Sequence, residues 1–147
     1  MELYGNHTLQ AQPEKVWAAL HDTDLLAHCV PGCQGIRWIS ENTLEAEIEL
    51  RAGGAYRTYR GEVCITNQRP PDHYRLLFGK SGRPGSVVAD IELAPKKQGT
   101  RLSYHVNAGL DGYLARLGAP IVNVIARRIA NRFFKRLNDE LSEADTT

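Results

Sequence analysis

The chain has 147 residues, of which 42% are hydrophobic and 24% are charged, and its formal net charge at pH 7 is +1. A chain of this length can bury a sizeable core, and the composition is that of an ordinary globular protein. The small net charge gives no global electrostatic reason to expect a nucleic acid or an acidic substrate. We therefore expect a single domain over residues 1–147 that has no nucleic-acid partner.

The targeting signals and the cysteine count bear on location. No apolar run approaches the roughly 20 residues that span a bilayer, and the N-terminus lacks the basic and apolar regions of a secretory signal. The chain has an odd number of cysteines, namely Cys29, Cys33 and Cys64, which predicts no disulfide framework. The expected location is the cytoplasm.

The first third of the chain predicts a strand followed by two short helices. Residues 2–10 alternate with period two, which places Gly5 and His7 on one face of a strand. Pro13 and Glu14 suit the first turn of a helix over 13–20. Asp22 or Thr23 can cap a second helix over 24–29, which must end at the Val-Pro-Gly of residues 30–32.

The middle of the chain predicts strand after strand. Residues 44–51 alternate strictly, and further strands are expected over 55–66, 74–78, 87–93 and 102–106. Gly53-Gly54, Pro70-Pro71-Asp72 and the stretch 95–99 mark turns, and we interpret 79–85 as a flexible loop. Short strands with brief connections are typical of an antiparallel meander.

The final third changes to a helical period. Apolar residues recur at steps of three or four and predict one stripe of a helix: Leu114, Leu117, Ile121, Ile125, Ile129, Phe133, Leu137 and Leu141. Gly118 and Pro120 interrupt the start of this stripe, so the helix either kinks there or begins near 119. The stripe needs a partner, and the inward face of the sheet is the only surface large enough. We therefore predict an α+β fold, in which a curved antiparallel sheet of about seven strands wraps around a long C-terminal helix.

A strongly bent sheet need not meet a single helix everywhere, so we expect an apolar cavity between them. The predicted lining is His7, Leu44, Ile48, Tyr59, Val63, Tyr74, Leu76, Ile91, Leu102, Tyr104, Leu117, Ile121 and Ile125. His7 would be either a polar anchor for an apolar ligand or a core histidine bonded to backbone. The tyrosines would either line the pocket or belong to the core with their hydroxyl groups at the rim.

The inventory of catalytic and metal-binding groups is thin. No carboxylate is predicted near His7 to make it a general base. Cys29 and Cys33 lie near His21 and His28, but the spacing matches no structural zinc site. The glycine-rich stretch 79–85 is followed by a strand and not by the helix of a P-loop. We expect no catalytic residue, no metal and no enzymatic activity.

The predicted helix carries a run of positive charge. Between Tyr113 and Asn138 there are six basic residues and no acidic one. Five of them form the predicted contact surface for an acidic partner or for anionic lipid headgroups: Arg127, Arg128, Arg132, Lys135 and Arg136. Compensation of the helix dipole is the alternative role for the last two.

Several motifs together resemble the G-subunit family of carbon monoxide dehydrogenase. They cover the chain from Met1 to about Leu141: Gly5, Pro-Glu-Lys-Val-Trp at 13–17, Leu20, Asp22, Leu25, Val-Pro-Gly-Cys at 30–33, Tyr59-x-Gly61, Pro71, Tyr74-x-Leu76, Gly99-Thr100, Tyr104, Gly118 and Phe133-Phe134. The segment ending in Val-Pro-Gly-Cys is the most diagnostic. Two departures are Gln34, where the family usually has an acid, and an end just after the helix, where founding-type members carry an extension that can reach a membrane.

The resemblance implies a helix-grip fold of the START and Bet v 1 type and a pocket sized for a lipid or quinone. It also implies an accessory role beside a molybdenum-containing carbon monoxide dehydrogenase or related oxidoreductase, with peripheral contact at the inner face of the membrane. A quinone, isoprenoid or lipid would bind non-covalently. The alternatives are a cyclase- or hydrolase-like enzyme of the same fold, and a purely protein-docking accessory protein without a ligand cavity.

Overall fold

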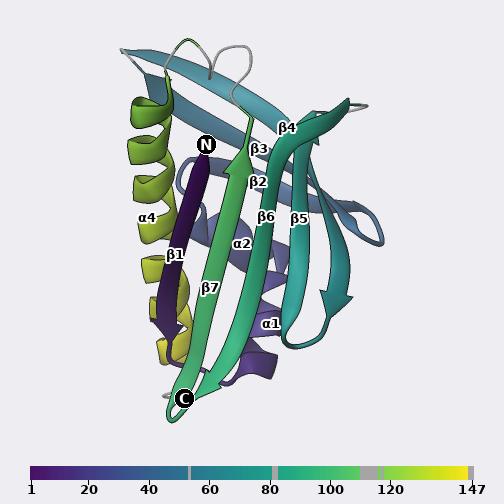
Figure 1. The fold of residues 1–147 in the computed structure, drawn as a ribbon, viewed down its shortest axis with the longest axis vertical. Coiled ribbons are helices and arrows are strands. Elements are labelled where there is room, and N and C mark those ends of the chain that lie inside the picture. Colours follow the sequence, from purple (N-terminus) through teal and green to yellow (C-terminus); the bar gives the residue numbers. More distant parts are fainter. Residues whose placement is uncertain (53, 81–82, 110–115, 117, 146–147) are drawn as a thin grey trace.

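The computed structural model describes residues 1–52, 54–80, 83–109, 116 and 118–145, which form one antiparallel sheet and three helices (Figure 1). The strands are β1 (Glu2–Leu9), β2 (Cys33–Ser40), β3 (Thr43–Ala52), β4 (Ala55–Arg69), β5 (His73–Lys80), β6 (Arg83–Lys96) and β7 (Gly99–Ala108). The helices are α1 (Pro13–Leu20), α2 (Thr23–Cys29) and α4 (Ala119–Asp145). The strand order β1-β7-β6-β5-β4-β3-β2 makes β2 to β7 a meander, and β1 pairs with the last strand.

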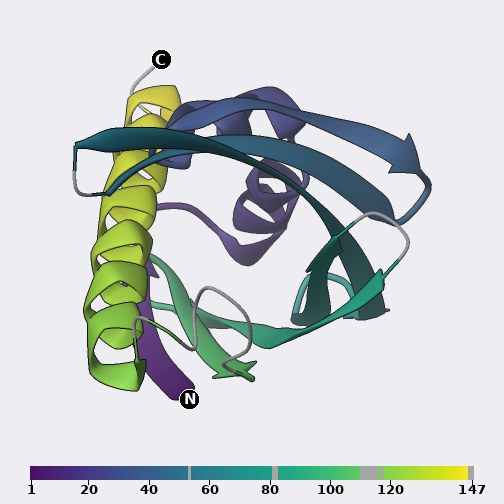
Figure 2. The ribbon, with the colours of Figure 1, turned by 90° about the horizontal axis from the view of Figure 1, so that it is seen from above.

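The sheet is strongly bent, and the helices occupy its concave side. Figure 2 shows β3 and β4 forming one wall and β1, β7 and β6 the other, with α1 and α2 between them and α4 along one side. Irregular registers mark places where extra residues in β2, β4 and β6 bend a strand. The predicted α+β class, the antiparallel meander and the curved seven-stranded sheet are confirmed.

The two short helices begin where their capping residues predict. Pro13 opens α1, with Glu14 in its first turn. The Asp22 side chain accepts hydrogen bonds from the backbone N–H groups of Asp24 and Leu25, so Asp22 caps α2 and Thr23 is its first residue. Val16, Ala19 and Leu20 of α1 and Cys29 of α2 are buried and pack both helices into the core.

Two parts of the strand pattern differ from the sequence prediction. The predicted loop over 79–85 is wrong, because β5 runs to Lys80 and β6 starts at Arg83, with these two residues paired. Gly79, Pro84 and Gly85 lie at the ends of these two strands, where glycine and proline are tolerated. The strand β2 received no boundaries from the sequence, since adjacent Trp38 and Ile39 are both exposed and break the alternation of apolar and polar residues.

Helix α4 begins where the sequence indicates, but its apolar stripe is only partly buried. Leu137 and Leu141 are buried, whereas Ile121 is 52% exposed and Ile125 is 43% exposed. A step of four residues advances about 40° around a helix, so five such steps from Ile121 to Leu141 carry the stripe about 200° around the axis. The predicted burial of Ile121 and Ile125 is therefore wrong. Leu114 and Leu117 lie outside the described residues.

One close approach between β1 and β7 fixes the local geometry. Gly5 is paired with Tyr104, and a Cβ atom at Gly5 would collide with the Tyr104 ring. The ring therefore lies across the bare backbone of β1, while Tyr104 itself is 6% exposed. Glycine is required here because nothing larger leaves room for the ring.

We predict that Gly5→Ala lowers the free energy of unfolding by about 1–3 kcal/mol, because the new methyl group displaces the Tyr104 ring from a packed core. Urea denaturation would measure the change. The matched control is Gly35→Ala in β2, where a Cβ atom would meet nothing within 4 Å. Equal effects of the two substitutions would contradict this account of Gly5.

Candidate functional site

The strand registers bring most of the predicted pocket residues onto one inner face. Tyr104, Ile91 and Tyr74 lie in one row across β7, β6 and β5. Leu44 pairs with Val63, and Ile48 pairs with Tyr59, across β3 and β4. Five residues of the predicted lining are almost fully buried and pack together: Leu44, Tyr74, Ile91, Leu102 and Tyr104. These five belong to the core as well as to the predicted lining.

Exposure increases along the inner face toward one end. On β4, Ile65 is 2% exposed, Val63 is half-buried, and Tyr59 is 37% exposed although it points inward. Ile48, which faces Tyr59, and Leu76, which pairs with Ile65, are half-buried. The inner face is therefore closed at the Tyr74 end and open to solvent at the Tyr59 end. Leu117 lies outside the described residues, and Ile121 and Ile125 are on the exposed side of α4.

His7 lies in an aromatic cluster with residues from β7 and α4. Its ring stacks on Phe134 at a centroid distance of 4.3 Å and lies 5.9 Å from the Tyr104 ring. Burial lowers the pKa of the His7 imidazole, which favours the neutral form. The sequence placed His7 correctly on the inward face but did not identify Phe134 as its partner.

A second aromatic cluster contains a histidine that sequence reasoning did not place in the pocket. Trp17 stacks on His21 at 4.7 Å, and both rings contact Tyr74, at 5.1 Å and 5.3 Å between centroids. His21 Nδ1 is 2.7 Å from the Trp17 carbonyl oxygen. The four-residue spacing of Trp17 and His21, which puts them on one helix face, was the signal available in the sequence.

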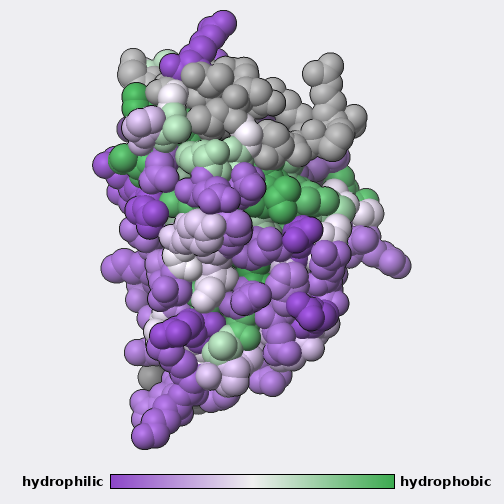
Figure 3. Space-filling model, in the orientation of Figure 1, coloured by the Kyte–Doolittle hydropathy of each residue, from purple (hydrophilic) through white to green (hydrophobic). Residues whose placement is uncertain are grey.

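The outer face of the sheet carries polar groups and two shallow hollows. One, of about 380 Å³, is lined by Arg75, Val88, Asp90, His105 and Asn107, and the other, of about 250 Å³, by Arg69, Asp72, His73, Glu92, Leu93, Ala94 and Ser103. Figure 3 shows this side as mostly hydrophilic, with one hydrophobic area toward the top. Neither hollow contains any residue predicted to line the pocket.

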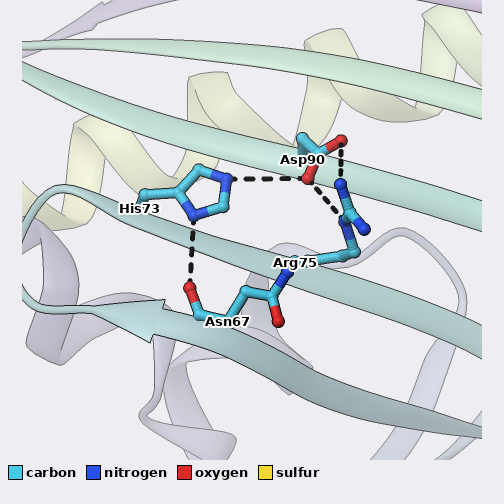
Figure 4. Close-up of polar contacts among 4 residues, drawn as sticks. All are labelled: Asn67, His73, Arg75 and Asp90. Atoms are coloured by element: carbon cyan, nitrogen blue, oxygen red, sulfur yellow. Dashed lines mark hydrogen bonds and ion pairs between the residues drawn. The ribbon is translucent and has the colours of Figure 1, made fainter.

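The titratable groups on this outer face neutralise one another. Arg75 Nε donates to Asp90 Oδ1 at 2.8 Å, and His73 Nε2 lies 3.5 Å from the same oxygen (Figure 4). His73 Nδ1 is 3.2 Å from the Asn67 carbonyl oxygen. The hydrogen bond from Arg75 holds the pKa of the Asp90 carboxyl below its usual range, which makes Asp90 a weak general base.

The cysteines and nearby histidines do not converge. His28 Nε2 forms an ion pair with Glu140 at 3.2 Å, while His21 points into the aromatic cluster. Within the residues that the structure describes, no group of three or more His, Cys, Asp or Glu side chains could hold a metal ion. Cys29 is completely buried, and burial raises the pKa of its thiol to about 11.

We predict that alkylation of Cys29 by iodoacetamide at pH 8 is at least about 100-fold slower than alkylation of half-buried Cys64, because a thiol of pKa about 11 is only about 0.1% thiolate at that pH and Cys29 is inaccessible. Peptide mass spectrometry over time would give both rates. Urea-unfolded protein, in which the rates should converge, is the control. Similar rates in the native protein would contradict the burial of Cys29.

The predicted basic surface is exposed on α4. Arg127, Arg128, Arg132, Lys135 and Arg136 are all exposed. Arg127 Nη1 donates to the Tyr4 carbonyl oxygen at 3.4 Å, and Lys135 is 3.7 Å from Asp139. The same side of the helix also carries exposed apolar residues, as Ile121, Ile125, Arg128 and Arg132 follow one another at steps of three or four, and exposed Val124 lies beside them, four residues before Arg128.

The fold and its inner face have counterparts among known proteins. The family model for the G subunit of carbon monoxide dehydrogenase (CoxG) matches residues 5–142. The chain belongs to the CoxG family. The match confirms the resemblance drawn from the sequence motifs, and it covers both short helices and nearly the whole sheet. No curated protein matches the chain at a significant level.

Solved structures share the fold of this chain. A conserved protein from Geobacillus kaustophilus is 26% identical, with a TM-score of 0.86, and the match covers 98% of this chain and 97% of that one. A START superfamily protein from Mycobacterium smegmatis is 10% identical, with a TM-score of 0.75 and coverage of 97% and 98%. Ara h 8.0201, of the Bet v 1 type, is 14% identical, with a TM-score of 0.67 and coverage of 97% and 98%. The helix-grip prediction is confirmed.

Among the described residues, no helix combines the length and the apolar character that a membrane span needs.

Proposed function

We propose that this CoxG family protein is a non-catalytic binding protein for an apolar ligand, held on the inner face between the sheet and α4. The observation that supports the proposal is the exposure of inward apolar side chains at one end of that face, where Tyr59 is 37% exposed and Ile48 is half-buried. A fully packed core would bury such residues. An apolar ligand would cover them and remove their surface from water.

The side chains on the inner face suit binding better than catalysis. The inward rows of the described strands carry mostly aromatic and aliphatic residues, with His7, Thr100 and Arg57 among the polar ones but no carboxylate, and the ion-paired Asp90 faces outward. A cyclase-like enzyme needs an acid or base positioned at the reacting atoms. The aromatic clusters of His7 and His21 give a mostly apolar site with few polar groups, which is the usual character of a small-molecule site.

The family suggests a ligand class and a partner for this proposal. We propose an isoprenoid quinone or a related lipid as the non-covalently bound ligand, and a molybdenum-containing carbon monoxide dehydrogenase or related oxidoreductase as the partner that exchanges electrons with it. The family name supports the partner. The elongated inner face, which is apolar from Tyr59 to Ile65, supports a ligand with a hydrocarbon tail.

Ile48→Glu should weaken the binding of decylubiquinone at least about tenfold, because it places a charge where the hydrocarbon tail would lie. Isothermal titration calorimetry would measure affinity, and native mass spectrometry would give stoichiometry. Thr58→Glu is the matched control, since Thr58 lies beside Tyr59 on β4 and faces the opposite side of the sheet. A wild-type protein that binds neither decylubiquinone nor any co-purifying lipid would refute the proposed function.

A second function is favoured by the exposed side of α4. We propose that this side docks on an anionic lipid surface, from which the ligand could be collected. Ile121, Val124 and Ile125 are 52%, 58% and 43% exposed, and cations follow them along the same side of the helix. Apolar side chains can enter the headgroup region while arginines contact the phosphates. The exposed apolar side chains are a feature that the sequence pattern hid, because it assigned Ile121 and Ile125 to the buried stripe.

The double variant Val124→Glu/Ile125→Glu should abolish flotation of the protein with phosphatidylcholine vesicles that contain phosphatidylglycerol. Arg128→Glu/Arg132→Glu should do the same, because docking needs both the apolar and the cationic groups. Leu77→Glu, at a 38% exposed apolar position on the outer face of β5, should float like the wild type. Failure of the wild-type protein to float with anionic vesicles would refute lipid docking and leave a protein partner for this surface.

A further inference from the structure

His21 carries a buried hydrogen-bond acceptor that nothing satisfies. A carbonyl oxygen can only accept, so the Nδ1 atom that lies 2.7 Å from the Trp17 carbonyl oxygen carries the proton and donates it. In the neutral imidazole this leaves Nε2 with a bare lone pair. Nε2 is buried, and no hydrogen-bond partner for it exists among the described residues. Buried polar atoms of this kind are rare and require an explanation.

Tyr74 supplies a complementary polar group beside it. The Tyr74 and His21 rings are 5.3 Å apart between centroids, and Trp17 packs against both. Tyr74 is 4% exposed, and burial alone raises the pKa of its hydroxyl, with no hydrogen bond contributing. An acceptor (His21 Nε2) and a group that can donate (the Tyr74 hydroxyl) therefore lie together in an apolar environment.

This pair lies at the closed end of the inner face. The inner row of β5 leads from Tyr74 to half-buried Leu76 and Phe78, which pair with Ile65 and Val63 of β4. Exposure along β4 then rises to Tyr59 at the open end. A ligand that entered at Tyr59 with its tail trailing would bring its polar head toward Tyr74 and His21.

We infer that His21 Nε2 and the Tyr74 hydroxyl bind the hydroxyl group of an apolar alcohol or phenol, such as a hydroquinone. This inference rests on the proposed function. A hydroxyl group donates to Nε2 and accepts from Tyr74 at the same time, so it satisfies both groups. A carbonyl or an ether oxygen only accepts, and would leave Nε2 unpaired. The site therefore prefers the reduced, hydroxyl-bearing form of a ligand to its carbonyl form.

The test compares two probes, 2-naphthol and its methyl ether 2-methoxynaphthalene, by isothermal titration calorimetry. The wild-type protein should bind the naphthol at least about tenfold more tightly, as expected when a buried acceptor is satisfied by one ligand and left unpaired by the other. His21→Asn should bring the ratio close to one. The asparagine amide can still donate to the Trp17 carbonyl oxygen but has no atom in place of Nε2. Tyr74→Phe should reduce the preference in part.

The other inner-face histidine provides the matched control, since His7→Asn should keep the preference intact. Loss of the preference in His7→Asn but not in His21→Asn would move the anchor to His7 and overturn the inference. Equal binding of the two probes by the wild-type protein would also overturn the inference, and a bound water would then be the partner of Nε2. That result would not contradict the proposed carrier function. Binding of neither probe would count against the carrier function itself.

A measurement on the wild-type protein avoids any effect of substitutions on folding. The 15N resonance of His21 Nε2 should report an unprotonated nitrogen in the free protein, and should move upfield when 2-naphthol is added but not when its methyl ether is added. A protonated Nε2, or no difference between the probes, would overturn the assignment of Nε2 as the acceptor.

Discussion

The uneven attachment of α4, which buries large side chains only in its second half, governs the rest of the structure. Phe134, Leu137 and Leu141 are buried against the sheet and the short helices, and Gln10 at the end of β1 bonds to Asn138 and Ser142. Full burial of one such leucine contributes about 1.5–3 kcal/mol, so this half is firmly held. A helix of 27 residues is about 40 Å long, and its first half is held by smaller side chains, namely buried Val122 and partly buried Ala126 and Ala130. The open inner face and the exposed apolar side chains of α4 both follow from this asymmetry.

Because successive side chains of a strand point to opposite faces of the sheet, most polar groups of the strands lie on its outer face. Asp90, Arg75 and His73 face outward and contact one another, whereas the inward rows are mostly apolar and carry only a few polar side chains, among them His7, Arg57 and Thr100. His21 is added to the inner side by a helix. Ion pairs on the outside need no ligand, while His21 Nε2 on the inside has no protein partner among the described residues. In the proposed binding mode, the polar head of the ligand is recognised at this unpartnered nitrogen.

The strand pattern was largely predictable because period-two alternation reports directly which residues face inward, as Ile48 and Tyr59 illustrate. The helical stripe was less informative, because a four-residue repeat drifts around the axis and so mixes exposed Ile121 with buried Leu141. The partnership of His21 with Tyr74 joins positions far apart in the chain, and no local pattern could have revealed it. Glycines near a hairpin similarly indicated a loop where the strands in fact continue to Lys80 and resume at Arg83.

The pairing of β1 with β7 has a consequence for biosynthesis. Glu2 is paired with Asn107 and Leu9 with Thr100, so β1 leaves the ribosome about a hundred residues before the strand with which it pairs. At about 5–20 residues per second this interval is roughly 5–20 s. During that time β1 has unpaired backbone groups and an apolar row that includes Leu3 and Leu9, the features that chaperones recognise and that promote misassociation. The nascent chain, more than the finished protein, is the form that needs protection.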